Sequence, residues 1–123
     1  MTEARIQQEI CVYYRNTYCL RHHVPRSLLM SIPNEGKPHL VQTGLYAGGA
    51  DLLLLHIAVG KAGTRVRVIF IEVKTPTGVV STKQKKFKNH IKAMGAIIND
   101  NLVSLEYHLV RSLAEFKKVI NNG

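Results

Sequence analysis

The sequence predicts a single α/β domain that spans residues 1–123. Apolar runs of strand length alternate with segments whose apolar residues recur at the helical period. The length suits one domain, and 46% hydrophobic residues are enough for one core. No apolar run reaches the roughly 18 residues of a membrane span, and the start lacks a signal-peptide layout. We therefore expect a soluble cytoplasmic protein that does not enter a membrane.

The first predicted element is a helix over residues 3–19. Thr2 can serve as its N-cap, and the apolar residues Ile6 and Ile10 recur at helical spacing. Glu9 lies three residues after Ile6 and therefore points toward the apolar side of the helix. By spacing alone, Glu9 is an exposed residue at the edge of the apolar stripe.

A short strand is predicted over residues 27–32, followed by a loop over residues 33–38 and a short helical turn over residues 42–46. Three glycines then give the backbone unusual freedom: Gly44, Gly48 and Gly49. They either form a plain connection or allow the backbone to approach another segment closely.

The strand predicted over residues 66–74 carries the most informative charges. Residues 68–71 are apolar without interruption, which is typical of a central strand covered on both faces. Glu72 and Lys74 follow on one face, about 7 Å apart along the strand, because side chains alternate. Two charges at the end of a buried strand are costly to desolvate, so we expect them to have a function.

An antiparallel hairpin brings a second acid to this pair. A strand over residues 50–58 is joined to the strand over residues 66–74 by a tight turn. With the turn centred between residues 61 and 62, the numbers of paired residues sum to 123. Without a bulge, Asp51 then lies opposite Glu72, with Cβ atoms about 5 Å apart. The two carboxylates repel each other, and a divalent cation between them would remove this repulsion.

The next predicted helix follows a turn over residues 75–78. Ser81 or Thr82 caps it, and Gly95 ends it after residue 94. The stripe that faces the core is predicted to contain Phe87, Ile91 and Met94. Gln84 lies at the edge of this stripe.

This helix has an unbalanced positive charge. It contains no acid and five lysines: Lys83, Lys85, Lys86, Lys88 and Lys92. At 100° per residue, Lys88, Lys92 and Lys85 lie about 40°, 80° and 100° from Gln84 around the axis. They form a ridge beside Gln84. A solvated face is the usual explanation of a charge run, but charge of one sign favours a track for phosphates.

A strand over residues 105–110 and a final helix complete the domain. Ser112 and Glu115 form a capping box that opens this helix. Its inward residues are predicted to be Leu113, Phe116 and Ile120. The six histidines show no metal-ligand spacing, and His56 is predicted to lie in the core or on a face of the sheet.

The hairpin residues suit metal-assisted hydrolysis. Asp51 and Glu72 offer hard oxygen ligands of the kind that Mg²⁺ or Mn²⁺ prefers, and the Val73 carbonyl could add a third. A metal held there would polarise a phosphodiester and lower the pKa of a bound water. Lys74 could orient or deprotonate that water, or stabilise charge on the phosphate.

An acid, a hairpin and then Glu-X-Lys resemble the PD-(D/E)XK nuclease superfamily, with Asp51 and Glu72-Val73-Lys74 as the matching positions. In detail the chain is similar to the virus-type replication-repair nuclease (VRR-NUC) branch, of the stand-alone phage or bacterial type. The similar segments are Pro-Asn-Glu-Gly (33–36), Gly-Gly-Ala-Asp-Leu (48–52), Ile-Glu-Val-Lys-Thr-Pro-Thr-Gly (71–78), Ser-X-X-Gln (81–84), Ala-Met-Gly (93–95) and Leu-Val-Arg-Ser (109–112). Ala50 departs from the motif, which has proline there, and this leaves the ligands intact.

The resemblance implies an α/β/α fold around a mixed sheet, like that of restriction endonucleases. It also implies a requirement for Mg²⁺ or Mn²⁺ and cleavage of structured DNA, such as four-way (Holliday) junctions, by a homodimer. Glu9 and Gln84 would match the helical Glu and Gln of the family, which adds both residues to the candidate site. The cellular setting implied is the cytoplasm of a bacterium or a phage-infected host.

The charge of the chain agrees with a nucleic-acid partner. Seventeen Lys and Arg residues against eight Asp and Glu leave a formal charge of +9, which attracts polyanions. The candidate DNA contacts are Lys83, Lys85, Lys88 and Lys92. The alternative is a DNA-binding module that keeps the fold and does not cleave. The paired acids argue against it, because a pure binder has no reason to hold two carboxylates near phosphate.

Overall fold

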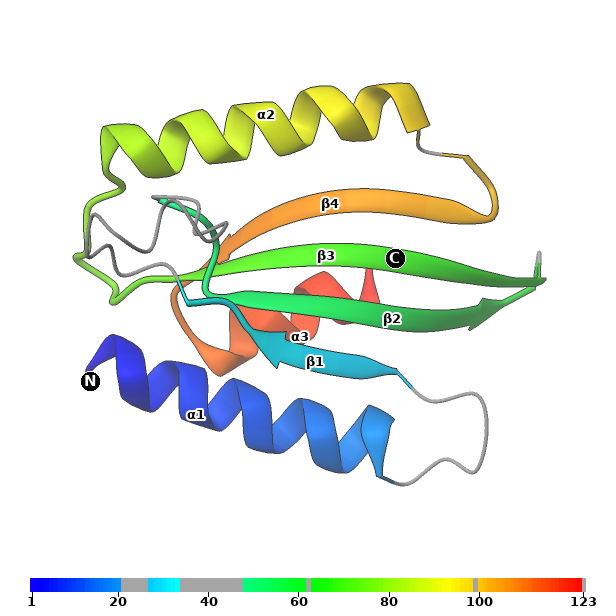
Figure 1. Cartoon of the computed structure of the whole chain (residues 1–123). Coiled ribbons are helices and arrows are strands. Elements are labelled where there is room, and N and C mark those ends of the chain that lie inside the picture. Colours follow the sequence, from blue (N-terminus) through cyan, green and yellow to red (C-terminus); the bar gives the residue numbers. More distant parts are fainter. Residues whose placement is uncertain (21–26, 34–47, 62, 99, 123) are drawn as a thin grey trace.

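The structure is a computed structural model that describes residues 1–20, 27–33, 48–61, 63–98 and 100–122. Along these residues, the chain forms helices and strands in the order expected for an α/β domain (Figure 1). The elements are α1 (Glu3–Tyr14), a π-helical turn η1 (Arg15–Cys19), β1 (Leu28–Ser31), β2 (Leu52–Gly60), β3 (Gly63–Val73), α2 (Thr82–Ile98), β4 (Val103–Val110) and α3 (Leu113–Asn121). Among them, no helix is long and apolar enough to cross a membrane.

The four strands form one mixed sheet in the order β1-β2-β3-β4. β1 pairs with β2, and β2 with β3, in antiparallel fashion, whereas β3 pairs with β4 in parallel. The hairpin register runs from Leu52 opposite Ile71 to Gly60 opposite Gly63, which confirms the predicted pairing. β3 is therefore flanked by strands on both sides, as its uninterrupted apolar run predicted.

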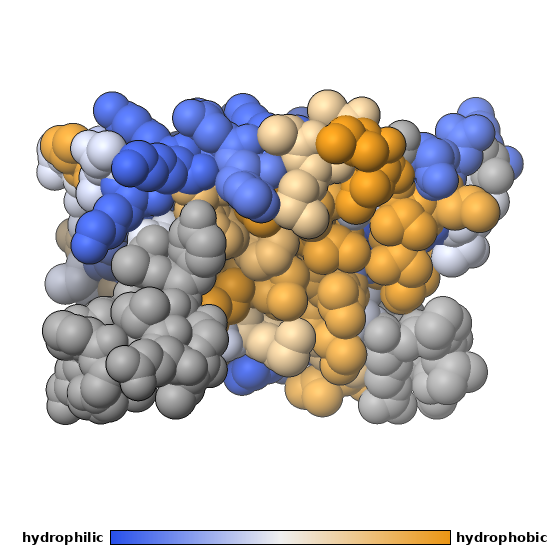
Figure 2. Space-filling model, turned by 45° about the horizontal axis from the view of Figure 1, so that its top comes forward, coloured by the Kyte–Doolittle hydropathy of each residue, from blue (hydrophilic) through white to orange (hydrophobic). Residues whose placement is uncertain are grey.

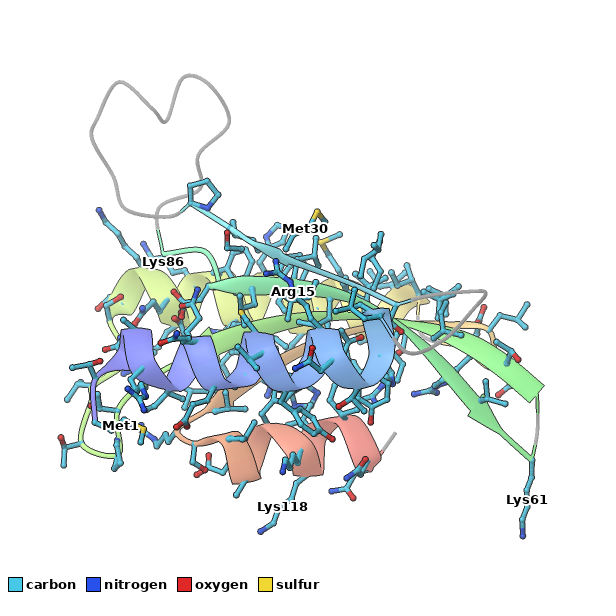
Figure 3. All side chains as sticks on the ribbon, turned by 90° about the horizontal axis from the view of Figure 1, so that it is seen from below. Met1, Arg15, Met30, Lys61, Lys86 and Lys118 are labelled. Atoms are coloured by element: carbon cyan, nitrogen blue, oxygen red, sulfur yellow. The ribbon has the colours of Figure 1, made fainter. Side chains whose placement is uncertain are left out.

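Helices cover both faces of this sheet, which confirms the α/β/α class (Figure 1). α1 and α3 pack on one face, where the buried residues include Ile6, Ile10, Leu54, Ile69, Ile71 and Phe116. α2 packs on the other face, where they are Ala50, Phe87, Ile91, Leu105 and Tyr107. Seen from below, Lys86 of α2 and Lys118 of α3 extend on opposite sides of the sheet (Figure 3).

Alternation along β3 assigns its side chains to these two layers. Ile69, Ile71 and Val73 lie in the cluster with α1 and α3, whereas Phe70 packs against the cluster under α2. Because side chains alternate along a strand, Glu72 shares the α2 face with Phe70. The acid therefore lies on the face of the sheet that α2 covers.

The first helix has the predicted extent but an irregular end. Thr2 caps it, with its Oγ1 accepting a hydrogen bond of 3.1 Å from the amide of Arg5. The α-helix gives way to η1, which ends at Cys19, so the predicted boundary at residue 19 is confirmed. The predicted loop at 34–38, the turn at 42–46 and Gly44 lie outside the described residues.

The predicted end of the second helix was wrong. α2 continues through Gly95 to Ile98, and Met94 is 43% exposed rather than part of the buried stripe. The buried stripe is Phe87, Ile91 and Gly95, at steps of four residues. A glycine inside a helix lowers its intrinsic stability, but packing of this face against β4 outweighs that local preference.

A polar network lies on the face covered by α1 and α3. Arg67 is 2% exposed and forms a salt bridge of 2.7 Å with Glu106, and its guanidinium also donates to the carbonyls of Val119 and Ile120 at the end of α3. Burial raises the pKa of Glu106, but hydrogen bonds from Arg67, His108 and Ser104 outweigh it and hold the pKa well below its usual range.

His56 is buried on the same face, as predicted, and its Nδ1 lies 2.8 Å from the hydroxyl of Tyr14. Burial, helped by the charge of Arg67, lowers the pKa of His56 to about 4. His56 is therefore a neutral core residue at pH 7 and not a metal ligand of the candidate site.

Candidate functional site

Asp51 is positioned by the strands on both sides of it. It immediately precedes β2, its carbonyl accepts a hydrogen bond of 2.8 Å from the amide of Ile32, and its amide donates to the carbonyl of Ile71 at 3.0 Å. Its Oδ2 accepts a further bond of 2.7 Å from the amide of Val73. The backbone bond to Ile71 departs by one residue from the register of the hairpin, so Asp51 does not pair directly with Glu72 as the regular register predicted.

Glu72 is the most unusual residue of the site. It is 1% exposed, and its Oε1 is buried without a hydrogen-bond partner among the described residues. Burial is the main cause that raises the pKa of Glu72 to about 9, helped by a hydrogen bond to Asp51 and by the like charge of Asp51. In the metal-free protein at pH 7, Glu72 is therefore protonated, and its carboxyl group is hydrogen-bonded to the side chain of Asp51.

Lys74 follows directly after β3. Its amide donates to the carbonyl of Val110 at 3.0 Å, so β4 fixes the backbone at this point. The positive charge of Lys74 opposes the rise in the pKa of Glu72, which indicates that the ammonium lies near that carboxyl. The structure therefore brings together the three residues of the predicted motif.

Arg111 anchors the turn that leaves the site, a role that the sequence did not reveal. Its Nη1 donates to the carbonyls of Thr75 and Gly78, at 2.6 and 2.8 Å. Hydrogen bonds from a charged group are stronger than those between neutral groups, so Arg111 stabilises the turn that follows Lys74. Basic residues near a helix start give no sequence signal for such a role, because it depends on β4 lying beside β3.

A pocket of about 300 Å³ opens beside the two acids. It lies at the end of the sheet where α1 and α2 both begin (Figure 1). Its lining comprises Glu3, Gly48, Gly49, Asp51, Glu72, Ser81, Lys83 and Gln84. The strand ends, the start of α1, the start of α2 and the glycine segment thus converge on one polar cavity.

Gln84 lies in this lining, where the sequence predicted it. Its Oε1 accepts a hydrogen bond of 2.8 Å from the amide of Ser81, and the Ser81 Oγ accepts one of 3.1 Å from the amide of Gln84. The two residues form a capping box at the start of α2. Gln84 therefore has a structural role in addition to its place in the pocket wall.

Gly48 is a close-approach glycine. Its φ is +78°, and a Cβ added to it would lie 2.6 Å from the backbone carbon of Lys83. Both the backbone conformation and the lack of space exclude a larger side chain. Of the two explanations for these glycines, close approach holds for Gly48, which joins the glycine segment to the start of α2.

The structure places Glu9, the predicted helical acid of the site, outside the pocket lining. Glu9 lies 3.9 Å from Arg5 in an exposed ion pair and is not part of the pocket lining. Glu3, the first residue of α1, lines the pocket instead. Glu3 stands out in the sequence only as an acid in the first turn. Its position in the pocket depends on the packing of the start of α1 beside the end of β3, which the sequence does not show.

The acids do not form a complete metal cage by themselves. Within the described ranges, no three His, Cys, Asp or Glu side chains are grouped closely enough to hold a metal ion. Asp51 and Glu72 supply two carboxylates, and the predicted third oxygen from Val73 belongs to the backbone. Such a partial set suits Mg²⁺, which commonly binds one or two carboxylates and completes its shell with waters and substrate phosphates.

The predicted lysines extend the polar surface from the pocket along α2. Lys83, Lys85 and Lys92 are exposed and Lys88 is half-buried, and α2 contains no acid. Figure 2 shows hydrophilic residues gathered over one half of α2 and hydrophobic residues over the other half and the sheet below it. Lys83, Lys85 and Lys88 lie in the half that begins at the pocket, and Lys92 lies just past the middle of α2. The hydrophobic residues Met94, Ile97 and Ile98 are exposed near the other end.

The comparison with solved structures identifies the fold. No protein-family model and no curated protein matches the chain. A solved structure described as a "VRR_NUC domain protein" is similar over 100% of this chain and 91% of its own, with a TM-score of 0.63 and 15% sequence identity. The chain therefore has a nuclease-like α/β/α fold, and the predicted fold class is confirmed.

Proposed function

We propose that this protein is a metal-dependent DNA endonuclease that hydrolyses phosphodiester bonds, of the VRR-NUC type within the PD-(D/E)XK superfamily. The observation that carries the proposal is the pair Asp51 and Glu72 at the wall of a polar pocket, with one Glu72 oxygen buried and unpartnered among the described residues. The similar fold of a VRR_NUC domain protein supports it.

The donor set fits a divalent cation of the Mg²⁺ or Mn²⁺ type. Two neighbouring carboxyl groups, one of them buried, destabilise the metal-free protein but suit the binding of a cation. Asp51, Glu72 and the Val73 carbonyl would hold the metal, and Glu3 lines the same pocket. When bound, the cation would polarise the scissile phosphate and favour ionisation of a water.

The remaining residues have distinct tasks in this proposal. Lys74 orients the attacking water or stabilises the charge that develops on the phosphate. Gln84 keeps the start of α2 in place against the pocket, and Lys83 contacts the phosphate at its wall. Lys85, Lys88 and Lys92 bind the DNA backbone away from the bond that breaks.

We further propose branched DNA, such as a four-way junction, as the substrate and a homodimer as the active form. A four-way junction has two equivalent strands to cut, and a twofold dimer presents two equivalent sites to them. Light scattering of the protein with and without junction DNA tests the dimer. A monomer under both conditions would contradict this part of the proposal.

A labelled synthetic four-way junction tests the activity. We expect cleavage with Mg²⁺ or Mn²⁺ and none in EDTA. Glu72→Gln and Lys74→Ala should each lower the cleavage rate by at least about 100-fold, the scale of losing one preorganised catalytic group. Lys118→Ala, on the opposite side of the sheet, serves as the matched control and should cleave normally (Figure 3). Cleavage that persists in EDTA would overturn the metal-dependent site.

The alternative, a DNA-binding module without cleavage, predicts a different result. Junction DNA would then bind tightly and remain intact with every metal, and Glu72→Gln would bind at least as well as the wild type. The buried acids favour the nuclease, because carboxylates beside a DNA backbone weaken binding unless a cation lies between them.

A further inference from the structure

Tyr107 is buried next to the candidate site with an unsatisfied hydroxyl. The residue is 6% exposed, and its hydroxyl has no hydrogen-bond partner among the described residues. A buried hydroxyl is normally bonded, as the hydroxyl of Tyr14 is to His56 on the other face of the sheet. The ring of Tyr107 has an ordinary packing role, with its centroid 6.1 Å from that of Phe87 under α2.

The strand register places Tyr107 diagonally beside Glu72. In the parallel pair of β3 and β4, Tyr107 is the partner of Phe70. Glu72 lies two residues further along β3, on the same face of the sheet as Phe70. The Cα atoms of Tyr107 and Glu72 are therefore about 8 Å apart, a span that a tyrosine side chain can cover in large part.

The electrostatics agree with this placement. Burial raises the pKa of Tyr107 above its ordinary value, and the nearby carboxylates of Glu72 and Asp51 raise it further. The hydroxyl therefore keeps its proton at neutral pH and can donate a hydrogen bond.

Two complementary groups are thus left unsatisfied on one face of the sheet. Tyr107 offers a donor, and the Oε1 of Glu72 offers an acceptor. Neither has a partner in the described part of the chain, and they do not bond to each other directly. A single water bonded to both would satisfy them, and Glu72 lines a polar pocket through which such a water can reach it.

We propose that Tyr107 is a positioning residue that donates a water-mediated hydrogen bond to Oε1 of Glu72 and orients this carboxylate for the cation. This inference rests on the proposed metal-dependent function. Residues that hydrogen-bond a metal ligand fix its orientation, and their loss typically lowers metal affinity about 10- to 100-fold. Tyr107 touches neither substrate nor metal, so its effect passes through Glu72.

Tyr107→Phe tests the inference, because it removes the hydroxyl and keeps the ring against Phe87. The probe is Mn²⁺, titrated into the protein without DNA while the melting temperature is recorded. We expect the melting temperature in EDTA to change little, since the packing of the ring against Phe87 is retained. The Mn²⁺ concentration for half of the stabilising shift should rise at least about 10-fold.

Tyr14→Phe is the matched control, because it removes a buried tyrosine hydroxyl on the other face. We expect it to lower the melting temperature in EDTA and to leave the half-maximal Mn²⁺ concentration unchanged. In a Glu72→Gln background, Tyr107→Phe should have no further effect on the Mn²⁺ response.

The outcomes separate this inference from the proposed function. If wild-type protein shows no shift with Mn²⁺, the metal-dependent function itself fails. If the wild type responds and Tyr107→Phe responds at the same Mn²⁺ concentration, the role of Tyr107 is refuted. An equal loss of Mn²⁺ response in Tyr14→Phe would also refute it, because the effect would then be general loosening.

Discussion

The Oδ2 of Asp51 accepts a 2.7 Å hydrogen bond from the amide of Val73, the residue between Glu72 and Lys74. One carboxylate oxygen therefore fixes the backbone that carries both other residues of the motif. Asp51 has a structural bond and a predicted ligand role in the same side chain, and substitutions can separate the two.

Asp51→Asn and Asp51→Ala should differ in stability but not in activity. Asparagine retains an oxygen that can accept from the Val73 amide, whereas alanine leaves that partly buried donor unpaired, at a cost of about 1–3 kcal/mol. Both variants lose the carboxylate, so both should lose metal-dependent cleavage. Urea unfolding and the junction assay measure the two properties. Full activity in Asp51→Asn would show that the charge is not needed.

Glu72→Gln should stabilise the metal-free protein while abolishing cleavage. The pKa of Glu72 is raised to about 9 in the folded state, above its value in the unfolded state. Between these two pKa values the folded protein binds a proton that the unfolded chain does not bind. The free energy of unfolding therefore falls as the pH rises through this range. At pH 7 the amide removes a penalty on the order of 1–3 kcal/mol. Melting in EDTA at pH 5 and pH 8 should show the larger gain at pH 8. A variant less stable than the wild type at pH 8 would contradict this.

Gly48→Ala should destabilise the protein by about 1–3 kcal/mol, through a strained φ and a clash with Lys83. Two other glycines are matched controls. Gly63 also has a positive φ, of +112°, but open space around it, and Gly60 has open space without a positive φ. Gly63→Ala should therefore show the strain alone, and Gly60→Ala should be nearly neutral. Equal effects at Gly48 and Gly63 in chemical denaturation would rule out the clash.

Stability should fall between pH 6.5 and pH 4 because of His56. The pKa of His56 is about 4 in the folded state, below its value in the unfolded state. The contribution of neutral His56 to the free energy of unfolding is therefore complete above about pH 6.5 and is lost as the pH falls toward 4. Between pH 7 and pH 5 the loss is about 2 kcal/mol. Glu106, with its lowered pKa, adds to the loss only at lower pH. His56→Gln should be less stable at pH 7 but should lose less between pH 7 and pH 5. An unchanged pH slope would exclude His56 as the cause.

The hairpin and its acids could be predicted from the sequence because their determinants are local. A tight turn fixes the register of the two strands it joins, and alternation then decides which side chains share a face. The pairing of Leu52 with Ile71 followed from that register, but the exact position of Asp51 did not, because its backbone bonds to Ile71, one residue out of register. The extent of the first helix and the burial of His56 were predicted from equally local patterns.

Glu3, Arg111 and Tyr107 could not be placed in this way. Each acts across elements that are distant in sequence. Glu3 depends on the start of α1 lying beside the end of β3, and Arg111 depends on β4 lying beside the turn after β3. Tyr107 of β4 lies diagonally beside Glu72 of β3. The error at Gly95 has the same origin, since packing on β4 overrode a local stop signal.

The sequence by itself determined the class of the fold, the hairpin that pairs two acids, and a helix with lysines on its surface. Only the tertiary structure decided which helical acid faces the pocket, why Gly48 must be a glycine, and which buried hydroxyl lies beside Glu72. Periodicity reports the face on which a residue lies along its own element. The partner opposite that face depends on how separate elements pack, and this information is distributed over the whole chain.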